Sequence, residues 1–307
     1  MGSGRFDADE WKGYATTSGY AHKSAEEIYT SRKIDPELDP KGVKVRESRD
    51  SADNPNSTAL AITLDVTGSM QPVLESVAKK AVQTLLTEIY DRKPVSDPHV
   101  MFMAVGDAEA GDTAPLQATQ FEADMRIAKQ LEKVFFEQGG GGNSYESYAL
   151  AWYFAANHTA LDCLEKRNKK GYLFTIGDEK PTPYLRQEDI ERVLGYKPQA
   201  KKTSMDEILT AVSRKFEIFH VIIEEGNHYR GDPHGVSSAW KEVLGQRVIH
   251  LADHTKLAEV IVSAIQVVEG ADHKEVAKSW DGTTSVVVGK AIKDLAKSTS
   301  VGGVVTL

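Results

Sequence analysis

Three oxygen-bearing side chains stand at alternate positions directly after a short apolar run. The run covers residues 59–64. The side chains that follow it are Asp65, Thr67 and Ser69, with Gly68 between the two hydroxyls. Such a group can converge at a strand-to-helix turn, which glycine allows the backbone to make. Carboxylate and hydroxyl oxygens are hard ligands that suit octahedral Mg²⁺ and tolerate Mn²⁺. The segment therefore favours a divalent metal site.

The elements that must hold these residues alternate between strands and helices. Short apolar runs predict strands over residues 59–64, 100–105, 171–176, 217–223 and 247–251. Helical spacing of apolar residues predicts helices over 73–89, 122–137, 145–157, 205–214 and 256–268. This alternation predicts an α/β fold with a doubly wound, mainly parallel central sheet flanked by helices. Ligands bind such sheets at the carboxyl ends of the strands, where Asp65 stands.

The segment 65–69 resembles the Asp-x-Ser/Thr-x-Ser signature of von Willebrand factor A-type domains, in which a metal-ion-dependent adhesion site holds Mg²⁺. Two further motifs of that family follow in the expected order. They are the glycine-rich loop 139–147 and Asp178, which comes after the strand predicted over 171–176. The resemblance covers roughly residues 57–269. It implies a metal site built from Asp65, Thr67, Ser69, a residue of the loop and Asp178.

The loop residue departs from the family pattern. Asn143 stands where the family usually has Thr or Asp, and its amide oxygen can coordinate a metal but lies farther from the backbone than a threonine hydroxyl. Ser144 is therefore the substitute candidate. Asp107 follows the strand predicted over 100–105 and belongs to the same edge of the sheet. We expect it to orient a ligand or a water molecule.

The resemblance also implies a function. With mostly neutral oxygens on the metal, an open position attracts a carboxylate, so an Asp or Glu of a partner protein can complete the coordination sphere. The expectation is a non-enzymatic, Mg²⁺-dependent protein–protein interaction module. Intracellular A-type domains of bacteria and phages commonly act with AAA+ ATPases or inside large assemblies, and such a partner is expected on the resemblance alone.

Composition and charge argue against other partners. The net charge of -8 disfavours nucleic-acid binding, which needs a basic face. No apolar run approaches the roughly 18 residues that span a bilayer. Residues 1–16 lack the apolar core of a signal peptide, and Cys163 is the single cysteine. We expect no nucleic-acid or membrane partner, and a cytoplasmic location, or the virion if the chain is of phage origin.

The sequence divides into three parts. Residues 1–56 are rich in charge and poor in large apolar side chains, which predicts an arm and linker without a core of their own. The resemblance implies an A-type domain over residues 57–270, and 271–307 are predicted to form a C-terminal extension with one helix over 286–297. The two extensions support a second hypothesis, in which the protein is a structural component that they tie into an assembly.

Three alternatives to the metal site stay open. The segment 65–69 is also similar to the aspartyl-phosphate motif of haloacid-dehalogenase-type phosphohydrolases, in which Asp65 would be the nucleophile. Against this, Val66 replaces a lysine, Thr182 stands where a second acid is expected after Asp178, and the glycine loop goes unexplained. An isolated Asp-x-Thr-Gly-Ser is also a common helix cap. The fold could, finally, persist without the ion.

Overall fold

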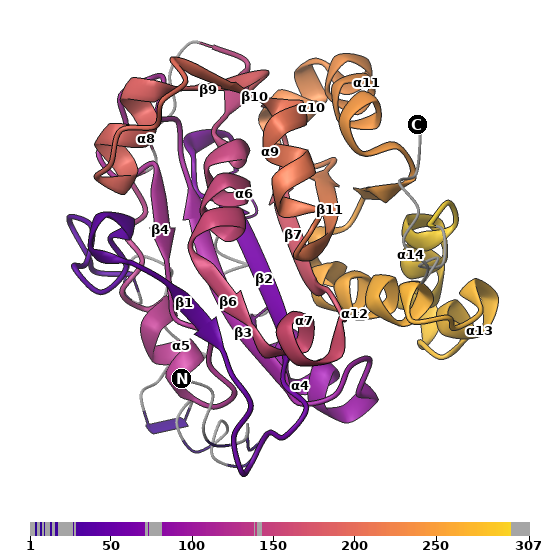
Figure 1. Ribbon diagram of the computed structural model, residues 1–307. Helices are drawn as coiled ribbons and strands as arrows, with labels where there is room; N and C mark the ends of the chain where they lie inside the picture. The colour runs from indigo at the N-terminus through magenta and orange to yellow at the C-terminus, as the bar shows by residue number, and fades with distance from the viewer. Residues whose placement is uncertain are drawn as a thin grey trace.

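The computed structural model describes residues 4, 7, 9, 13, 16–17, 27, 29–70, 73, 82–137, 139 and 143–295. A six-stranded sheet runs through the molecule with helices on both faces (Figure 1). Its strands, in spatial order, are β12 (Val248–Leu251), β11 (Phe216–Ile223), β7 (Gly171–Gly177), β2 (Thr58–Asp65), β3 (Pro98–Val105) and β4 (Leu116–Ala118). All neighbours are parallel except β3 and β4. The doubly wound, mainly parallel fold predicted from the sequence is confirmed.

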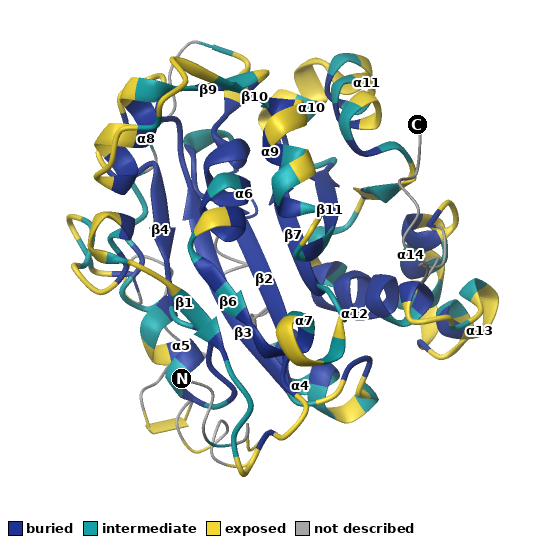
Figure 2. Ribbon diagram, viewed as in Figure 1, coloured by how far each residue is buried: buried dark blue, intermediate teal, exposed yellow. Residues whose placement is uncertain are grey.

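The central strands bury both of their faces. In β2, Leu60, Ile62 and Leu64 belong to one apolar core, whereas Ala59 and Ala61 belong to the core on the opposite face. Figure 2 shows the resulting band of buried residues through the middle of the sheet. Because helices cover both faces, the strand reads as a continuous apolar run rather than an alternating one.

Two helical layers supply these cores. One layer contains α4 (Val82–Arg92), α5 (Arg126–Leu131), α12 (Leu257–Val268), α13 (His273–Lys278) and α14 (Gly282–Ile292). The other contains α6 (Tyr148–Asn157), α7 (Asp162–Arg167), α8 (Gln187–Leu194), α9 (Met205–Val212) and α11 (Pro233–Leu244). The shorter elements are η1 (Pro40–Gly42), β1 (Arg46–Ser48), η2 (Gly68–Met70), β5 (Tyr145–Glu146), β6 (Thr159–Leu161), β8 (Lys180–Pro181), β9 (Tyr184–Arg186), β10 (Lys202–Ser204), α10 (Asn227–Gly231), η4 (Gly245–Arg247) and η5 (His254–Lys256). Within the part of the chain that the structure describes, no helix has the length and apolar character needed to cross a membrane.

Three helix predictions need correction. The helix predicted over 145–157 begins at Tyr148, because residues 145–146 form β5 and pair with β8. The helix predicted over 122–137 shrinks to α5, because the backbone of Glu122 bonds to that of Val100 and the backbone N–H of Phe135 to the side chain of Gln117. The C-terminal helix starts at Gly282 rather than 286 and follows α13, which the sequence did not predict.

The remaining helix predictions are close. The helices over 205–214 and 256–268 appear as α9 and α12. Residues 74–81 of the helix predicted over 73–89 lie outside the described residues, and its later part is α4. Residues 296–297 of the predicted C-terminal helix also lie outside them.

The order of strands reverses beside β2. The chain continues from β2 to β3 on one side and later places β7, β11 and β12 on the other. In an open parallel sheet, the crevice beyond the carboxyl ends of the strands at such a switch point is where ligands bind. Here β2 ends at Asp65 and β7 ends at Gly177, directly before Asp178.

Segments on both sides of the domain pack against it. On the N-terminal side β1 pairs with β6, Leu38 is buried and the ring of Tyr29 lies 4.2 Å from that of Phe136. On the C-terminal side the indole N–H of Trp280 donates to Ser263 of α12, at 2.8 Å. The described residues of both extensions therefore contribute to the packed structure.

Two buried histidines make the fold sensitive to acid. Burial lowers the pKa of His99 in β3 to about 4 and holds the pKa of His220 in β11 well below its usual value. Because the pKa of His99 is lower in the folded protein than in the unfolded chain, the fold favours the neutral imidazole. The stability that this contributes is complete above pH 6.5 and is lost as the pH falls through 4. We expect His99 to remove about 3 kcal/mol from the free energy of unfolding across this range.

Urea unfolding of the metal-free protein from pH 7 to pH 4 measures this loss. The variant His99→Gln should flatten the pH dependence, and His234→Gln, at an exposed position, should leave it unchanged. Parallel pH profiles for wild type and His99→Gln would contradict the assignment.

Candidate metal site

The turn after β2 brings the first three predicted ligands together. Asp65 is buried, and its Oδ1 accepts hydrogen bonds from the backbone N–H of Thr67 at 2.9 Å and from the Thr67 hydroxyl at 2.6 Å. The hydroxyls of Thr67 and Ser69 lie 3.1 Å apart. The turn thus presents one carboxylate and two hydroxyls as a single group.

Asp178 joins this group from the neighbouring strand. It follows β7, and its Oδ1 accepts a hydrogen bond of 2.7 Å from the Ser69 hydroxyl. Its Oδ2 accepts from the backbone N–H of His228 at 2.8 Å. Gly226 permits this approach, because a Cβ there would lie 2.3 Å from the Cβ of Asp178. The structure therefore places four of the five residues that the resemblance implied in one continuous hydrogen-bonded chain.

Tyr148 holds the other oxygen of Asp65. Its hydroxyl donates to Asp65 Oδ2 at 2.6 Å, and its ring packs edge-on against His220 and Trp240, with centroids 5.1 and 5.3 Å away. At Gly177 a Cβ would lie 1.9 Å from the Tyr148 hydroxyl oxygen, so glycine leaves the room for this contact. The sequence reasoning did not single out Tyr148, because its place in a helix following the glycine loop carries no sign of a hydroxyl aimed at Asp65.

Asn143 lies with Asp107 rather than in that chain. Its side-chain N–H donates to Asp107 Oδ2 at 2.6 Å, while Oδ1 of Asp107 accepts from the backbone N–H groups of Glu109 and Ala110. Ser144 is exposed. The backbone N–H of Gly68 donates to the carbonyl of Gly139, at 3.1 Å, which brings the start of the glycine run to the turn after β2. Residues 140–142 lie outside the described residues.

Two buried glutamates belong to the same cluster and were missed by sequence reasoning. Glu146 is 1% exposed and its Oε2 has no hydrogen-bond partner among the described residues. Glu179 pairs through Oε1 with the imidazole of His228 at 2.9 Å, whereas its Oε2 is also buried without a partner. Their positions could have indicated them: Glu146 lies near the end of the glycine-rich loop 139–147, and Glu179 directly follows Asp178.

The electrostatics of the cluster favour a cation. Burial, followed by the charge of Asp178, raises the pKa of Asp65 to about 7. Burial and the charge of Asp65 raise the pKa of Glu146 to about 12 and that of Glu179 to about 8. None of the ion pairs among the described residues involves Asp65, Glu146 or Asp178. Several buried carboxyl groups therefore destabilise one another's ionised forms, which a divalent cation would relieve.

The donor set fits Mg²⁺ or Mn²⁺. Carboxylate oxygens of Asp65 and Asp178 and the hydroxyls of Thr67 and Ser69 are hard ligands, and no sulfur or neutral imidazole nitrogen is part of the hydrogen-bonded chain. The Oε2 atoms of Glu146 and Glu179, buried without a hydrogen-bond partner among the described residues, are an independent indication that the cluster can accept a cation. The cluster holds more carboxyl groups than the resemblance implied.

A second group of possible ligands lies elsewhere. Ligand atoms of Glu225, Asp253 and His254 fall within 4.8 Å of one another. They are already bonded: Glu225 accepts from both the backbone and the ring of His254, and Asp253 Oδ1 accepts from Thr255. Because these ligand atoms already accept hydrogen bonds, the group is a weaker candidate for a cation site than the cluster around Asp65.

Comparisons with known proteins do not assign a family. No protein-family model matches the chain, and no curated protein matches it. Two solved structures of the pilus adhesin SpaC from Lactobacillus rhamnosus GG are similar, at 11% and 10% sequence identity with TM-scores of 0.46 and 0.45. The matches cover 73% and 74% of this chain but only 31% and 32% of the adhesin chains. Likeness at this level carries no argument about function.

Proposed function

We propose that this chain is a metal-dependent protein-interaction module. In this proposal Asp65, Thr67, Ser69 and Asp178 hold Mg²⁺ or Mn²⁺, and an acidic residue of a partner protein binds at the ion. The observation that carries the proposal is the hydrogen-bonded chain through these four residues at the switch point of the sheet. The bound ion would supply an open coordination position for the carboxylate of the partner.

The residues around the ligands have separate tasks in this proposal. Tyr148 fixes the orientation of Asp65, and the backbone N–H of His228 fixes Asp178. Asp107 and Asn143 hold each other beside the ligands and can orient water molecules. In the metal-free protein the raised pKa keeps Glu146 neutral at pH 7.

Calorimetric titration of Mg²⁺ and Mn²⁺ into metal-stripped protein tests the proposal. We expect saturable binding to one site, abolished in Asp65→Ala and weakened at least tenfold in Thr67→Val, which removes the hydroxyl and keeps the shape. A generic phosphatase assay runs alongside. Wild-type protein that binds neither ion would refute the metal site, and turnover that requires Asp65 would favour the phosphohydrolase alternative.

Partner capture with and without a chelator tests the second half of the proposal. The resemblance to A-type domains suggests an AAA+ ATPase or a multi-subunit assembly as the class to search. Capture should fail in chelator and in Asp65→Ala. Deletion of residues 1–28 separates the metal site from the N-terminal arm. A deletion that extends through residue 48 would also remove the buried Leu38 and β1, which pack on the domain. Capture lost by deletion but unaffected by Asp65→Ala would favour assembly through the extensions.

A further inference from the structure

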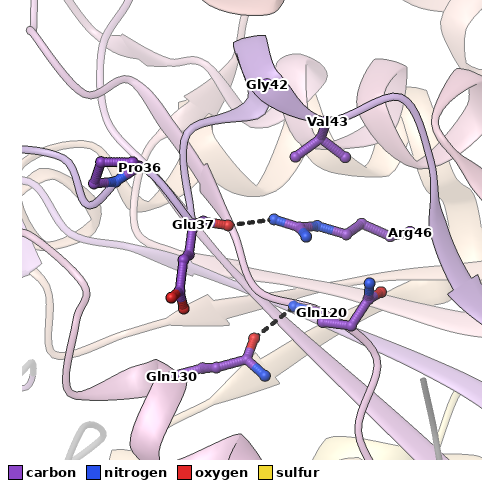
Figure 3. A pocket seen from close by; sticks show the side chains of 7 residues that line it. All are labelled: Pro36, Glu37, Gly42, Val43, Arg46, Gln120 and Gln130. Atoms are coloured by element: carbon purple, nitrogen blue, oxygen red, sulfur yellow. Dashed lines mark hydrogen bonds between the residues drawn. The ribbon is translucent and has the colours of Figure 1, made fainter.

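A second polar site lies away from the metal cluster, where the N-terminal segment packs on the domain. It is a cavity of about 350 Å³, a size at the lower end of small-ligand sites. Figure 3 shows the side chains that line it. Five lining residues belong to the N-terminal segment: Pro36, Glu37, Gly42, Val43 and Arg46. Gln120 lies in the connection between β4 and α5, and Gln130 lies in α5.

Arg46 brings unused hydrogen-bond donors to this cavity. Its Nη2 donates to the carbonyl oxygens of Glu37 and Ala118, at 2.5 and 2.8 Å (Figure 3 draws the first). Its Nε is buried and has no acceptor, and no acceptor among the described residues lies at Nη1. Two backbone carbonyls thus fix the guanidinium in place through Nη2 and leave the N–H groups of Nη1 free.

Gln120 adds a further free donor. Its Oε1 accepts from the backbone N–H groups of Glu47 and Phe121, at 3.2 and 3.1 Å, which fixes the orientation of the amide. Its Nε2 has no acceptor among the described residues. In Gln130, by contrast, both the oxygen and the nitrogen of the side-chain amide form hydrogen bonds: Oε1 accepts from the backbone N–H of Gln120, and Nε2 donates to Glu122.

The charge of Arg46 has no close counter-ion among the described residues. The carboxylate of Glu37 forms its ion pair with Lys133, at 2.5 Å, and that carboxylate is 68% exposed. Burial lowers the pKa of Arg46, and the charge of Glu37 only partly offsets this effect. Apart from the Glu37 carboxylate, which pairs with Lys133, the free polar atoms of the cavity are therefore donors, beside a guanidinium whose charge Glu37 offsets only in part.

We propose that this cavity binds a carboxylate, with Nη1 of the Arg46 guanidinium and Nε2 of Gln120 as its donors. A carboxylate fits better than a phosphate, because the site has one guanidinium and the Glu37 carboxylate at its wall would repel a dianion. The carboxylate belongs either to a small free acid or to an acidic side chain of a peptide. The site does not depend on the metal cluster.

Nuclear magnetic resonance of the full chain tests the site through the side-chain amide signal of Gln120. The probes are acetate, glutamate, a blocked Gly-Glu-Gly peptide and inorganic phosphate. We expect saturable shifts with the carboxylates and none with phosphate. Saturation by glutamate alone would identify a small free acid as the ligand, and tighter binding of the peptide would identify an acidic side chain.

Two variants make the test specific. Gln120→Glu keeps the acceptor for Glu47 and Phe121 but replaces the free donor with a carboxylate. Its binding is followed through the backbone amide signals of Glu47 and Phe121 and should weaken at least tenfold, while the thermal midpoint changes little. Arg46→Lys keeps the charge and removes the fork, and its binding, followed through Gln120, should also weaken tenfold. Arg214→Gln, at an exposed arginine outside the cavity lining, is the control. Absent carboxylate shifts, equal binding of phosphate, or equal affinity in Gln120→Glu would overturn the proposal.

Discussion

Asp65→Asn should stabilise the metal-free protein and at the same time abolish its stabilisation by Mg²⁺. The pKa of Asp65 is raised from 3.8 to about 7 in the folded protein, so the fold favours the protonated carboxyl group. The stability that this proton contributes is complete below pH 3.8 and is lost as the pH rises through 7. At pH 8 the buried carboxylate is ionised and destabilises the folded protein, and the neutral amide of asparagine removes this destabilisation. We expect a gain on the order of 2 kcal/mol in the free energy of unfolding, less at pH 5.

The same substitution should remove the response to metal. Wild-type protein should gain about 2.7 kcal/mol at a Mg²⁺ concentration of 100 times Kd, and Asp65→Asn should gain nothing there. Urea unfolding with and without Mg²⁺ measures both effects. Asp162→Asn is the matched control: Asp162 is also buried, but hydrogen bonds from Lys166 and Arg49 outweigh burial and lower its pKa, so this change should destabilise. Loss of stability in metal-free Asp65→Asn would contradict the electrostatic account of the site.

Gly177→Ala should damage both the fold and the site. The added Cβ would lie 1.9 Å from the hydroxyl oxygen of Tyr148 and 2.9 Å from Oδ2 of Asp65. Tyr148 is fully buried against His220 and Trp240, so its ring cannot move aside without disturbing the core. We expect a loss of roughly 1–3 kcal/mol in stability. Mg²⁺ affinity should fall at least tenfold, because Asp65 loses the contact that orients it.

A double-mutant cycle with Tyr148→Phe shows whether the hydroxyl is the cause. Tyr148→Phe removes the atom nearest to the added methyl group, so the stability cost of Gly177→Ala should be smaller in this background. The reduction in cost will be partial, since the ring carbon Cζ at position 148 would still lie 2.7 Å from the new Cβ at position 177. Calorimetry and urea unfolding of the four proteins measure the coupling. Strictly additive costs would show that Gly177 is required for another reason.

The fold and the first half of the site could be predicted from the sequence because their causes are local. Apolar runs of strand length, each followed by polar residues, mark buried parallel strands and their carboxyl ends. Asp65, Thr67 and Ser69 lie on one turn, so chain connectivity alone brings their oxygens together. Asp178 follows from the same rule, because β7 lies beside β2 and runs parallel to it.

Tertiary structure alone decided which other side chains complete the cluster. Tyr148 reaches Asp65 only because α6 packs over β2 and Gly177 leaves room for its hydroxyl. Glu146 enters because residues 145–146 pair with β8 instead of starting the helix. Asn143, in contrast, turned to Asp107. Periodicity specifies which face of an element is buried, but the partner of a buried polar atom depends on neighbouring elements far away in the sequence, and such contacts leave no periodic signal.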